Sequence, residues 1–240
     1  LLGAVGGQPG VGATNPEYNV SGGWNNILIG GVSNGTLAPV AVTNFLYLER
    51  AAAATQLTYT ASDAAGVWWA PAAGVTAATV NLGVDGTEAA GGTGGVNAGF
   101  LTFNVGSLFT DPLNTGDGIQ TVTLNSFGTA TAAGQNKIAL FDVHGGAKKG
   151  IATLNISGDE NVLVTNAQGT ITTINAAGST APGTLQTWVT KGIAGVDLTG
   201  VIHAATGVTI TGGASFIAAD MNLGSIATSV DTFKTGSGGG

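Results

Sequence analysis

Three turn-rich stretches carry the oxygen-bearing side chains in this sequence that are best suited to bind a metal ion. These side chains are Asp85, Glu88, Asp111, Asn114, Asp117, Asp159 and Glu160. Carboxylates, side-chain amide oxygens and backbone carbonyls are the ligands that calcium prefers. We therefore expect calcium to bind at one or more of these stretches.

The same acidic stretches also have a purely structural interpretation. None of them has the residue spacing of an EF-hand loop. Asp and Asn side chains commonly hydrogen-bond to the backbone two residues on and so build Asx-turns without any metal. The sequence leaves both interpretations open for each stretch.

Residues that could act in nucleophilic catalysis are few. Gly31–Gly35 fits the G-x-S-x-G pattern around Ser33, but the residues at Thr36–Val40 do not begin a helix, as a nucleophile elbow requires. The chain has two histidines, His144 and His203, and no cysteine. Thiolate chemistry and thiolate zinc sites are therefore unavailable. We expect no enzymatic activity.

Four tryptophans offer a different kind of binding chemistry. They are Trp24, Trp68, Trp69 and Trp188. Exposed aromatic rings on a β-scaffold can stack on sugars, whereas tryptophans in cores and subunit interfaces serve packing. Because adjacent residues of a strand point to opposite faces, one of Trp68 and Trp69 should lie on the outer surface.

Composition narrows the class of protein. Of 240 residues, 42 are Gly, 36 Ala and 33 Thr, and only 8% are charged, against about 25% in an average soluble domain. Disordered segments are rich in charge and poor in β-branched residues, so this composition does not predict a disordered chain. No apolar run reaches the ~18 residues of a membrane-spanning helix, so we expect no membrane span.

Charge also bears on possible partners. The net charge is −7, and residues 1–118 hold seven of the 13 acidic residues and one of the six basic ones. No basic stripe is present that could follow a phosphate backbone, so nucleic-acid binding is not expected. We expect two parts: an acidic, Gly/Ala-rich β domain over residues 1–118 and a repeat-containing β-ladder over residues 119–240.

Secondary-structure signals are mainly those of short strands. Alternating segments bounded by Gly, Asn and Asp predict strands at Gln56–Thr60, Thr79–Val84, Phe100–Val105 and Ile119–Asn125. The single helix-like stretch is LYLERAAAAT at Leu46–Thr55, whose residues have high intrinsic helix propensity. We therefore expect an all-β protein with at most one short helix near 46–55.

A weak internal repeat lies in the second half of the chain. Four segments begin with Ile or Val, carry Thr two places on and then alternate; they start at Ile119, Ile151, Ile171 and Val230. The intervals are 32, 20 and 59 residues, which suggests a unit of about 20, with an insertion near 135–149 explaining the longer first interval. Alternation predicts that Val122, Leu124, Leu154, Ile156 and Ile174 face inward, and that Thr121, Thr153, Thr173 and Thr232 face outward.

Units of this size must stack to bury their apolar faces. The predicted fold is a β-solenoid, a ladder of stacked short strands, with a conventional β-sandwich as the alternative. Rungs ~4.8 Å apart would let outward Thr and Asn side chains hydrogen-bond along the stack.

Several segments resemble a known family. These are GIATLNISGDENVLVTNAQGTITTINAAGST at 150–180, GVTITGG at 207–213 and DTFKTGSGGG at 231–240. They are similar to the β-rich, lattice-forming region of RTX-type surface-layer (S-layer) proteins and related type I secreted proteins of Gram-negative bacteria. The likeness is clearest over residues 100–240.

The resemblance implies a function and a location. It implies a structural protein that associates with itself into a calcium-stabilised lattice on the outside of the bacterial cell, anchored to outer-membrane polysaccharide through regions outside this chain. It also implies that a glycine-rich calcium repeat follows Gly240 and that the chain is part of a longer polypeptide. The alternative is a β-repeat module of a large type I secreted adhesin.

Overall fold

The described part of the chain is built from β-strands alone. The computed structural model describes residues 17–19, 26–29, 45–60, 66–83, 95–104, 118–129, 134–142, 149–165, 171–183, 195–199, 207–219, 230 and 232–238. Sixteen strands and no helix lie within these ranges. The expectation of an all-β fold is confirmed.

The strands form two sheets of eight, and each sheet contains every second strand of the chain. The odd sheet contains, in spatial order, β1 (Glu17–Asn19), β3 (Phe45–Ala51), β5 (Gly66–Pro71), β7 (Asn97–Phe103), β9 (Asn136–Asp142), β11 (Val162–Thr165), β13 (Val196–Thr199) and β15 (Ile217–Ala219). The even sheet contains β2 (Asn26–Ile29), β4 (Gln56–Tyr59), β6 (Ala77–Leu82), β8 (Thr121–Ser126), β10 (Thr153–Gly158), β12 (Thr173–Ser179), β14 (Thr209–Thr211) and β16 (Thr232–Lys234).

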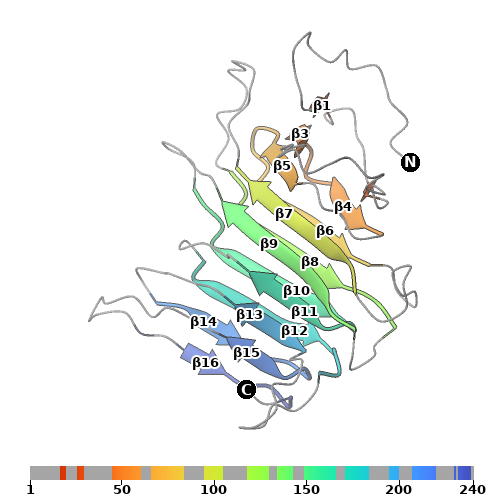
Figure 1. Ribbon diagram of the computed structural model, residues 1–240. Helices are drawn as coiled ribbons and strands as arrows, with labels where there is room; N and C mark the ends of the chain where they lie inside the picture. Colours follow the sequence, from red (N-terminus) through yellow and green to blue (C-terminus); the bar gives the residue numbers. More distant parts are fainter. Residues whose placement is uncertain are drawn as a thin grey trace.

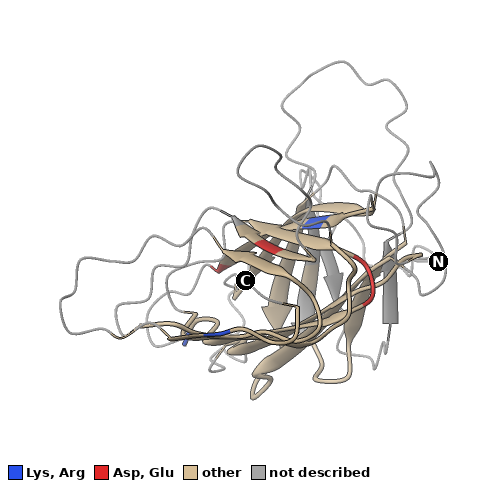
Figure 2. Cartoon of the chain, turned by 90° about the horizontal axis from the view of Figure 1, so that it is seen from below, with Lys and Arg blue, Asp and Glu red and all other residues tan. Residues whose placement is uncertain are grey.

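Neighbouring strands within each sheet are parallel wherever the structure describes a pairing. The chain therefore passes from one sheet to the other and back, and each pair of consecutive strands adds one rung to the stack. Figure 1 shows the rungs following one another from the N-terminal to the C-terminal strands, and Figure 2 shows the two sheets facing each other. Parallel pairing of this kind is that of a β-solenoid-like ladder, not of an antiparallel sandwich.

The register explains the internal repeat and corrects its period. Thr121, Thr153, Thr173, Thr209 and Thr232 are aligned across five successive strands of the even sheet. Successive intervals are therefore 32, 20, 36 and 23 residues. The 59-residue interval contains one intervening rung, not the two that a 20-residue unit predicts. The expected insertion near 135–149 is also wrong, because it contains β9 of the opposite sheet.

The predicted helix at Leu46–Thr55 is wrong. Residues Phe45–Ala51 form β3, which pairs with β1 on one side and β5 on the other. The chain then turns, with the Thr55 N–H donating to the Ala52 carbonyl over 3.0 Å. Intrinsic helix propensity is a weak preference that tertiary pairing overrides, and here burial of Leu48 (0% exposed) between two neighbouring strands decides the outcome.

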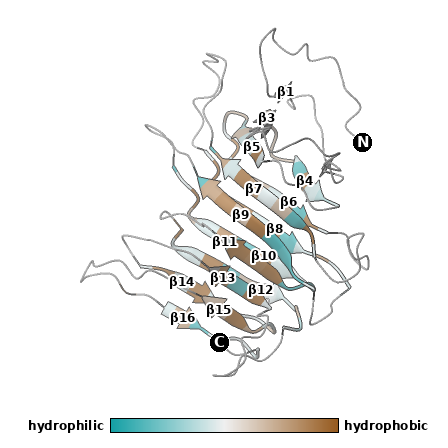
Figure 3. Ribbon diagram, in the orientation of Figure 1, coloured by the Kyte–Doolittle hydropathy of each residue, from teal (hydrophilic) through white to brown (hydrophobic). Residues whose placement is uncertain are grey.

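Apolar side chains of aligned strands form continuous columns between the sheets. One column contains Ala78, Val122, Leu154, Ile174 and Ile210, and none of these residues is more than 3% exposed. Figure 3 shows hydrophobic residues distributed through both sheets along the stack. The predicted inward face of the repeat, which also includes Leu124 and Ile156, is confirmed.

Strand pairing continues across the expected division at residue 118. β6 pairs with β8 in the even sheet, and β7 pairs with β9 in the odd sheet. The two-part organisation of the chain stays a prediction.

Candidate functional site

Two of the predicted metal ligands lie together at a corner of the ladder. Asp159 and Glu160 follow the end of β10 and precede β11, and both border Gly128 of the preceding rung. Asp159 Oδ1 accepts a hydrogen bond from the Gly128 N–H over 3.3 Å. Glu160 Oε1 accepts one from the Asn161 N–H over 3.1 Å. Each carboxylate thus already stabilises a turn, as the structural interpretation of the sequence allows.

Burial of Glu160 depends on glycine at two neighbouring positions. Its side chain is 2% exposed. A Cβ atom added at Gly128 or at Gly134 would collide with the carboxylate or its adjoining carbons. Glu160 is therefore a carboxylate enclosed by backbone, whereas Asp159 is half-buried and closer to solvent.

The remaining predicted ligands fall outside the described residues. These are Asp85, Glu88, Asp111, Asn114 and Asp117. Within the described part of the chain, no group of three or more His, Cys, Asp or Glu residues is placed to hold a metal ion. Calcium binding therefore stays a prediction. Ser33, His144 and His203 also lie outside the described residues.

A line of polar side chains runs along the outer face of the even sheet. Asn81 donates from Nδ2 to Thr58 Oγ1 over 3.0 Å and to Gln56 Oε1 over 3.2 Å. Asn125 donates from Nδ2 to Asn81 Oδ1 over 2.7 Å, and Ser157 Oγ donates to Asn125 Oδ1 over 2.6 Å. This outer polar ladder joins four successive rungs, which confirms the expectation of hydrogen bonds along the stack.

A buried polar cluster, which the sequence reasoning missed, lies at one corner of the ladder. Asp142 is 5% exposed and ends β9 in the inward phase set by Ile138 and Leu140. Its Oδ1 accepts from Asn104 Nδ2 over 2.7 Å, and its Oδ2 accepts from the Ile151 N–H over 2.7 Å. The signal was present in the sequence, because Asp142 occupies an apolar position of the alternation.

Asn104 completes this corner. It has a positive φ of 60°, in the left-handed region that Asn tolerates better than most residues. Its Nδ2 also donates to the Ile119 carbonyl over 3.1 Å, and its Oδ1 accepts from the Ile119 N–H. The Asn104 side chain therefore gives the Ile119 backbone the hydrogen bonds that a neighbouring strand would otherwise provide, at the point where the backbone leaves the sheet.

The buried side-chain amide of Asn136 provides hydrogen-bond partners for polar groups at the opposite corner of the ladder. Asn136 Oδ1 accepts from the Val96 N–H over 2.6 Å. Its Nδ2 donates to the Leu82 carbonyl, to Ser126 Oγ and to the Phe127 carbonyl over 2.9–3.1 Å. Because buried polar groups without partners are costly, these side chains fix the corners of the ladder.

The two adjacent tryptophans point to opposite faces, as predicted. Trp69 is 1% exposed and lies against Phe103, with ring centroids 5.9 Å apart. Trp68 is half-buried on the outer face of the odd sheet, in register with Thr102 and Phe141. Phe141 in turn contacts Phe100, which is 49% exposed, at a centroid distance of 5.6 Å. Trp24 and Trp188 lie outside the described residues.

Comparisons of the sequence with protein-family models, with curated proteins and with solved structures found no match. Among the described residues, no helix has the length and apolar character needed to cross a bilayer.

Proposed function

We propose that this chain is a structural segment of a bacterial surface-layer protein, which associates with itself into a calcium-stabilised lattice outside the cell. The observation that supports a scaffold most directly is the outer polar ladder. Asn81 and Asn125, which could otherwise contact a ligand, are instead engaged in bonds between rungs. Together with continuous apolar columns, this arrangement gives a stiff body of stacked strands. In this function the chain acts as a scaffold and catalyses no reaction.

The negative charge of the chain is the reason why a bound calcium ion would help the subunits associate. A net charge of −7 with only six basic residues makes subunits repel one another. A divalent cation bound by carboxylates within or between subunits offsets that repulsion. Asp159 is the described candidate best placed for such contact, because it is a half-buried carboxylate at a corner of the ladder.

Electron microscopy of the purified chain with calcium, and after addition of a calcium chelator, tests this function. Ordered sheets should form with calcium and disperse after chelation, and readdition of calcium but not of magnesium should restore them. Asp159→Asn should raise the calcium concentration needed for order, whereas Asp197→Asn, on the outer face of the odd sheet, serves as the matched control. Order that survives chelation would reject the calcium part of the proposal, and the lack of any lattice would reject the function.

A second candidate function, an adhesin module, is favoured by one observation. Trp68, Phe100 and Phe141 gather on the outer face of three successive strands of the odd sheet. Aromatic rings on an open surface can stack on sugar rings. Saturable glycan binding that is lost in Trp68→Ala and Phe100→Ala, without any lattice at high protein concentration, would favour the adhesin over the surface layer.

A further inference from the structure

The outer face of the even sheet carries two columns of short polar side chains beside the outer polar ladder. In the first column the register aligns Thr121, Thr153, Thr173, Thr209 and Thr232. The second column lies two residues further along each strand and contains Thr79, Thr123, Asn155, Asn175 and Thr211. Residues two positions apart in a strand share a face, so both columns lie on one surface. We call these two columns the threonine face.

The hydroxyl groups of the threonine face are accessible and not used within the chain. Each of its threonines is half-buried, whereas the inward residues between them, such as Val122 and Leu154, are 0% exposed. Among the described residues, none of these threonine hydroxyls has a hydrogen-bond partner. The neighbouring outer polar ladder differs, since Asn81, Asn125 and Ser157 bond to one another. The threonine face therefore offers its hydroxyls to a ligand outside the chain.

The groups of the threonine face are held at fixed spacings in two directions. Parallel pairing places successive rungs ~4.8 Å apart, and residues i and i+2 of one strand are separated by ~6.6 Å. Threonine is branched at Cβ and has few χ1 rotamers in a strand, so little side-chain freedom is lost on binding. The bonds of Asn125 to the rungs on both sides keep neighbouring strands in register. The result is a rigid, nearly rectangular array of hydroxyl and methyl groups.

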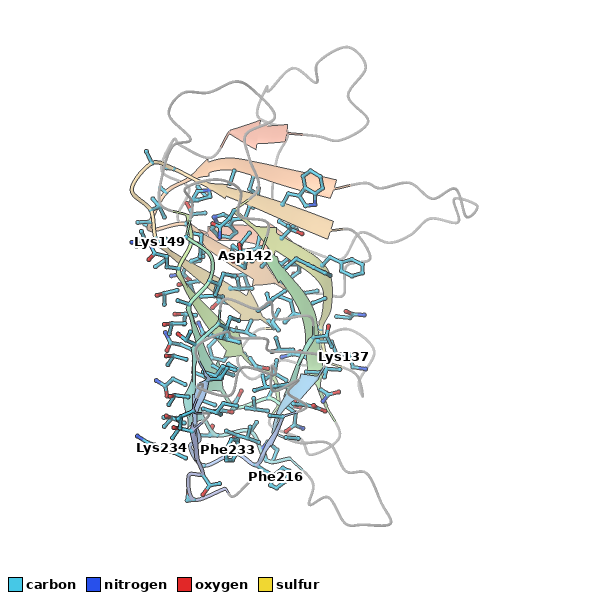
Figure 4. The ribbon with its side chains drawn as sticks, turned by 90° about the vertical axis from the view of Figure 1, so that its left-hand side faces the viewer. Lys137, Asp142, Lys149, Phe216, Phe233 and Lys234 are labelled. Atoms are coloured by element: carbon cyan, nitrogen blue, oxygen red, sulfur yellow. The ribbon has the colours of Figure 1, made fainter. Side chains whose placement is uncertain are left out.

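The threonine face is neutral, although the chain has a net charge of −7. None of its residues is charged or aromatic, and the first charged residue along the second column is Lys234, which follows Thr211. Figure 4 shows Lys234 pointing away from the opposite sheet, and Lys137 of the odd sheet on the other side of the ladder. A neutral face lacks the cations that bind acidic or phosphorylated ligands. It suits a ligand that carries no charge and repeats at the spacing of the array.

We propose that the threonine face binds the surface of ice. On the prism planes of hexagonal ice, water oxygens repeat in two perpendicular directions, at distances close to the spacing between rungs and to the spacing between the two columns. Water molecules that bond to the threonine hydroxyls are thereby held near lattice positions, and such bridging waters bind nearly as well as direct contacts. Liquid water has no fixed repeat, so the array favours the crystal over the liquid. This binding function goes beyond the proposed scaffold and does not depend on it.

The first experiment measures thermal hysteresis, the gap between the melting and freezing temperatures of an ice crystal, in solutions of the full 240-residue chain. Calcium chelator is present, so that the proposed lattice does not contribute. The wild-type chain should give a gap that grows with concentration. Thr173→Tyr should lose most of the gap, because a bulky ring in the middle of the first column keeps the array from the ice surface.

Thr102→Tyr is the matched control for this measurement. Thr102 is also a half-buried threonine on an outer face, but it belongs to the odd sheet, in register with Trp68. The control should give the same thermal hysteresis as the wild-type chain. If circular dichroism shows that Thr173→Tyr is misfolded, Thr123→Tyr in the second column replaces it.

The second experiment follows the chain on a single crystal of ice. The chain has no cysteine, so Lys137→Cys provides one exposed thiol on the side of the ladder away from the threonine face. A fluorescent label at this thiol leaves the threonine face free. The labelled chain should adsorb to the prism planes, and the labelled chain that also carries Thr173→Tyr should not.

Four results would overturn the proposal. They are a wild-type chain whose thermal hysteresis does not exceed that of serum albumin at the same concentration, a Thr173→Tyr chain as active as wild type, an equal loss in Thr102→Tyr, and adsorption that leaves the prism planes bare. The surface-layer function is tested separately, by calcium-dependent order, so none of these results bears on it.

Discussion

Asn125 joins its rung to both neighbouring rungs through one side chain, and its bond to Asn81 is the central link. Its Nδ2 donates to Asn81 Oδ1 over 2.7 Å, while its Oδ1 accepts from Ser157 Oγ over 2.6 Å. An amide is well suited to this position because it carries a donor and an acceptor at once. The stack is therefore held on its outer face by side chains as well as by the strand pairing.

Removing the Asn125 amide should destabilise the ladder. Asn125→Ala loses two hydrogen bonds, each contributing about 0.5–1.5 kcal/mol, so the free energy of unfolding should fall by about 1–3 kcal/mol. Urea denaturation measures the change. Thr123→Ala, at the outward position two residues earlier, is the control and should cost less. Equal losses in the two variants would show that the amide ladder contributes nothing specific.

Truncation of an inner-column leucine should have a larger effect than truncation of an outer one. Leu154 is 0% exposed within the column of Val122 and Ile174, whereas Leu163 is half-buried on the outer face of the odd sheet. Leu154→Ala should reduce the free energy of unfolding by about 2–5 kcal/mol, because it removes apolar contact and leaves a cavity. Leu163→Ala, measured in the same denaturation assay, should reduce the free energy of unfolding by much less. The reverse ranking would contradict the assignment of the inner and outer faces.

Replacement of Gly158 should disturb the corner that leads to Asp159. Gly158 has a φ of +106°, and a Cβ atom there would collide with the Ser126 carbonyl. Gly158→Ala combines backbone strain, about 1–3 kcal/mol, with this collision. Gly74→Ala is the matched control, because Gly74 also has a positive φ, +77°, but has open space around it. Thermal unfolding should show a larger fall in Tm for Gly158→Ala.

The buried carboxylate of Asp142 should not tolerate conversion to an amide. Both of its oxygens accept hydrogen bonds, from Asn104 Nδ2 and from the Ile151 N–H. Asp142→Asn places an NH₂ group against a donor, and leaving such a group unsatisfied costs about 1–3 kcal/mol. Hydrogen exchange of the Ile151 amide provides the local readout, and faster exchange is expected. Unchanged exchange together with unchanged stability would mean that the corner does not depend on both oxygens of Asp142 acting as acceptors.

The interior of the even sheet was predictable because alternation is a local property. Val122, Leu154 and Ile174 are separated from outward Thr residues by one position, and only one strand orientation buries all of them. The candidate metal site was predictable only in part. Residue type singled out Asp159 and Glu160, but Gly128 comes from another rung and its approach could not be inferred from spacing.

The amino-acid sequence by itself determined that the chain makes short strands, which side of the repeat strands is apolar, and that few charges are available to interrupt stacking. Tertiary structure decided which segments became neighbours, that Leu46–Ala51 is strand and not helix, and that Asp142 is buried. The physical reason is that alternation is encoded between adjacent residues, whereas pairing joins residues 20 to 44 positions apart through connections of variable length. Those distant partners, and not the local preferences of the chain, set the final energy balance at each position.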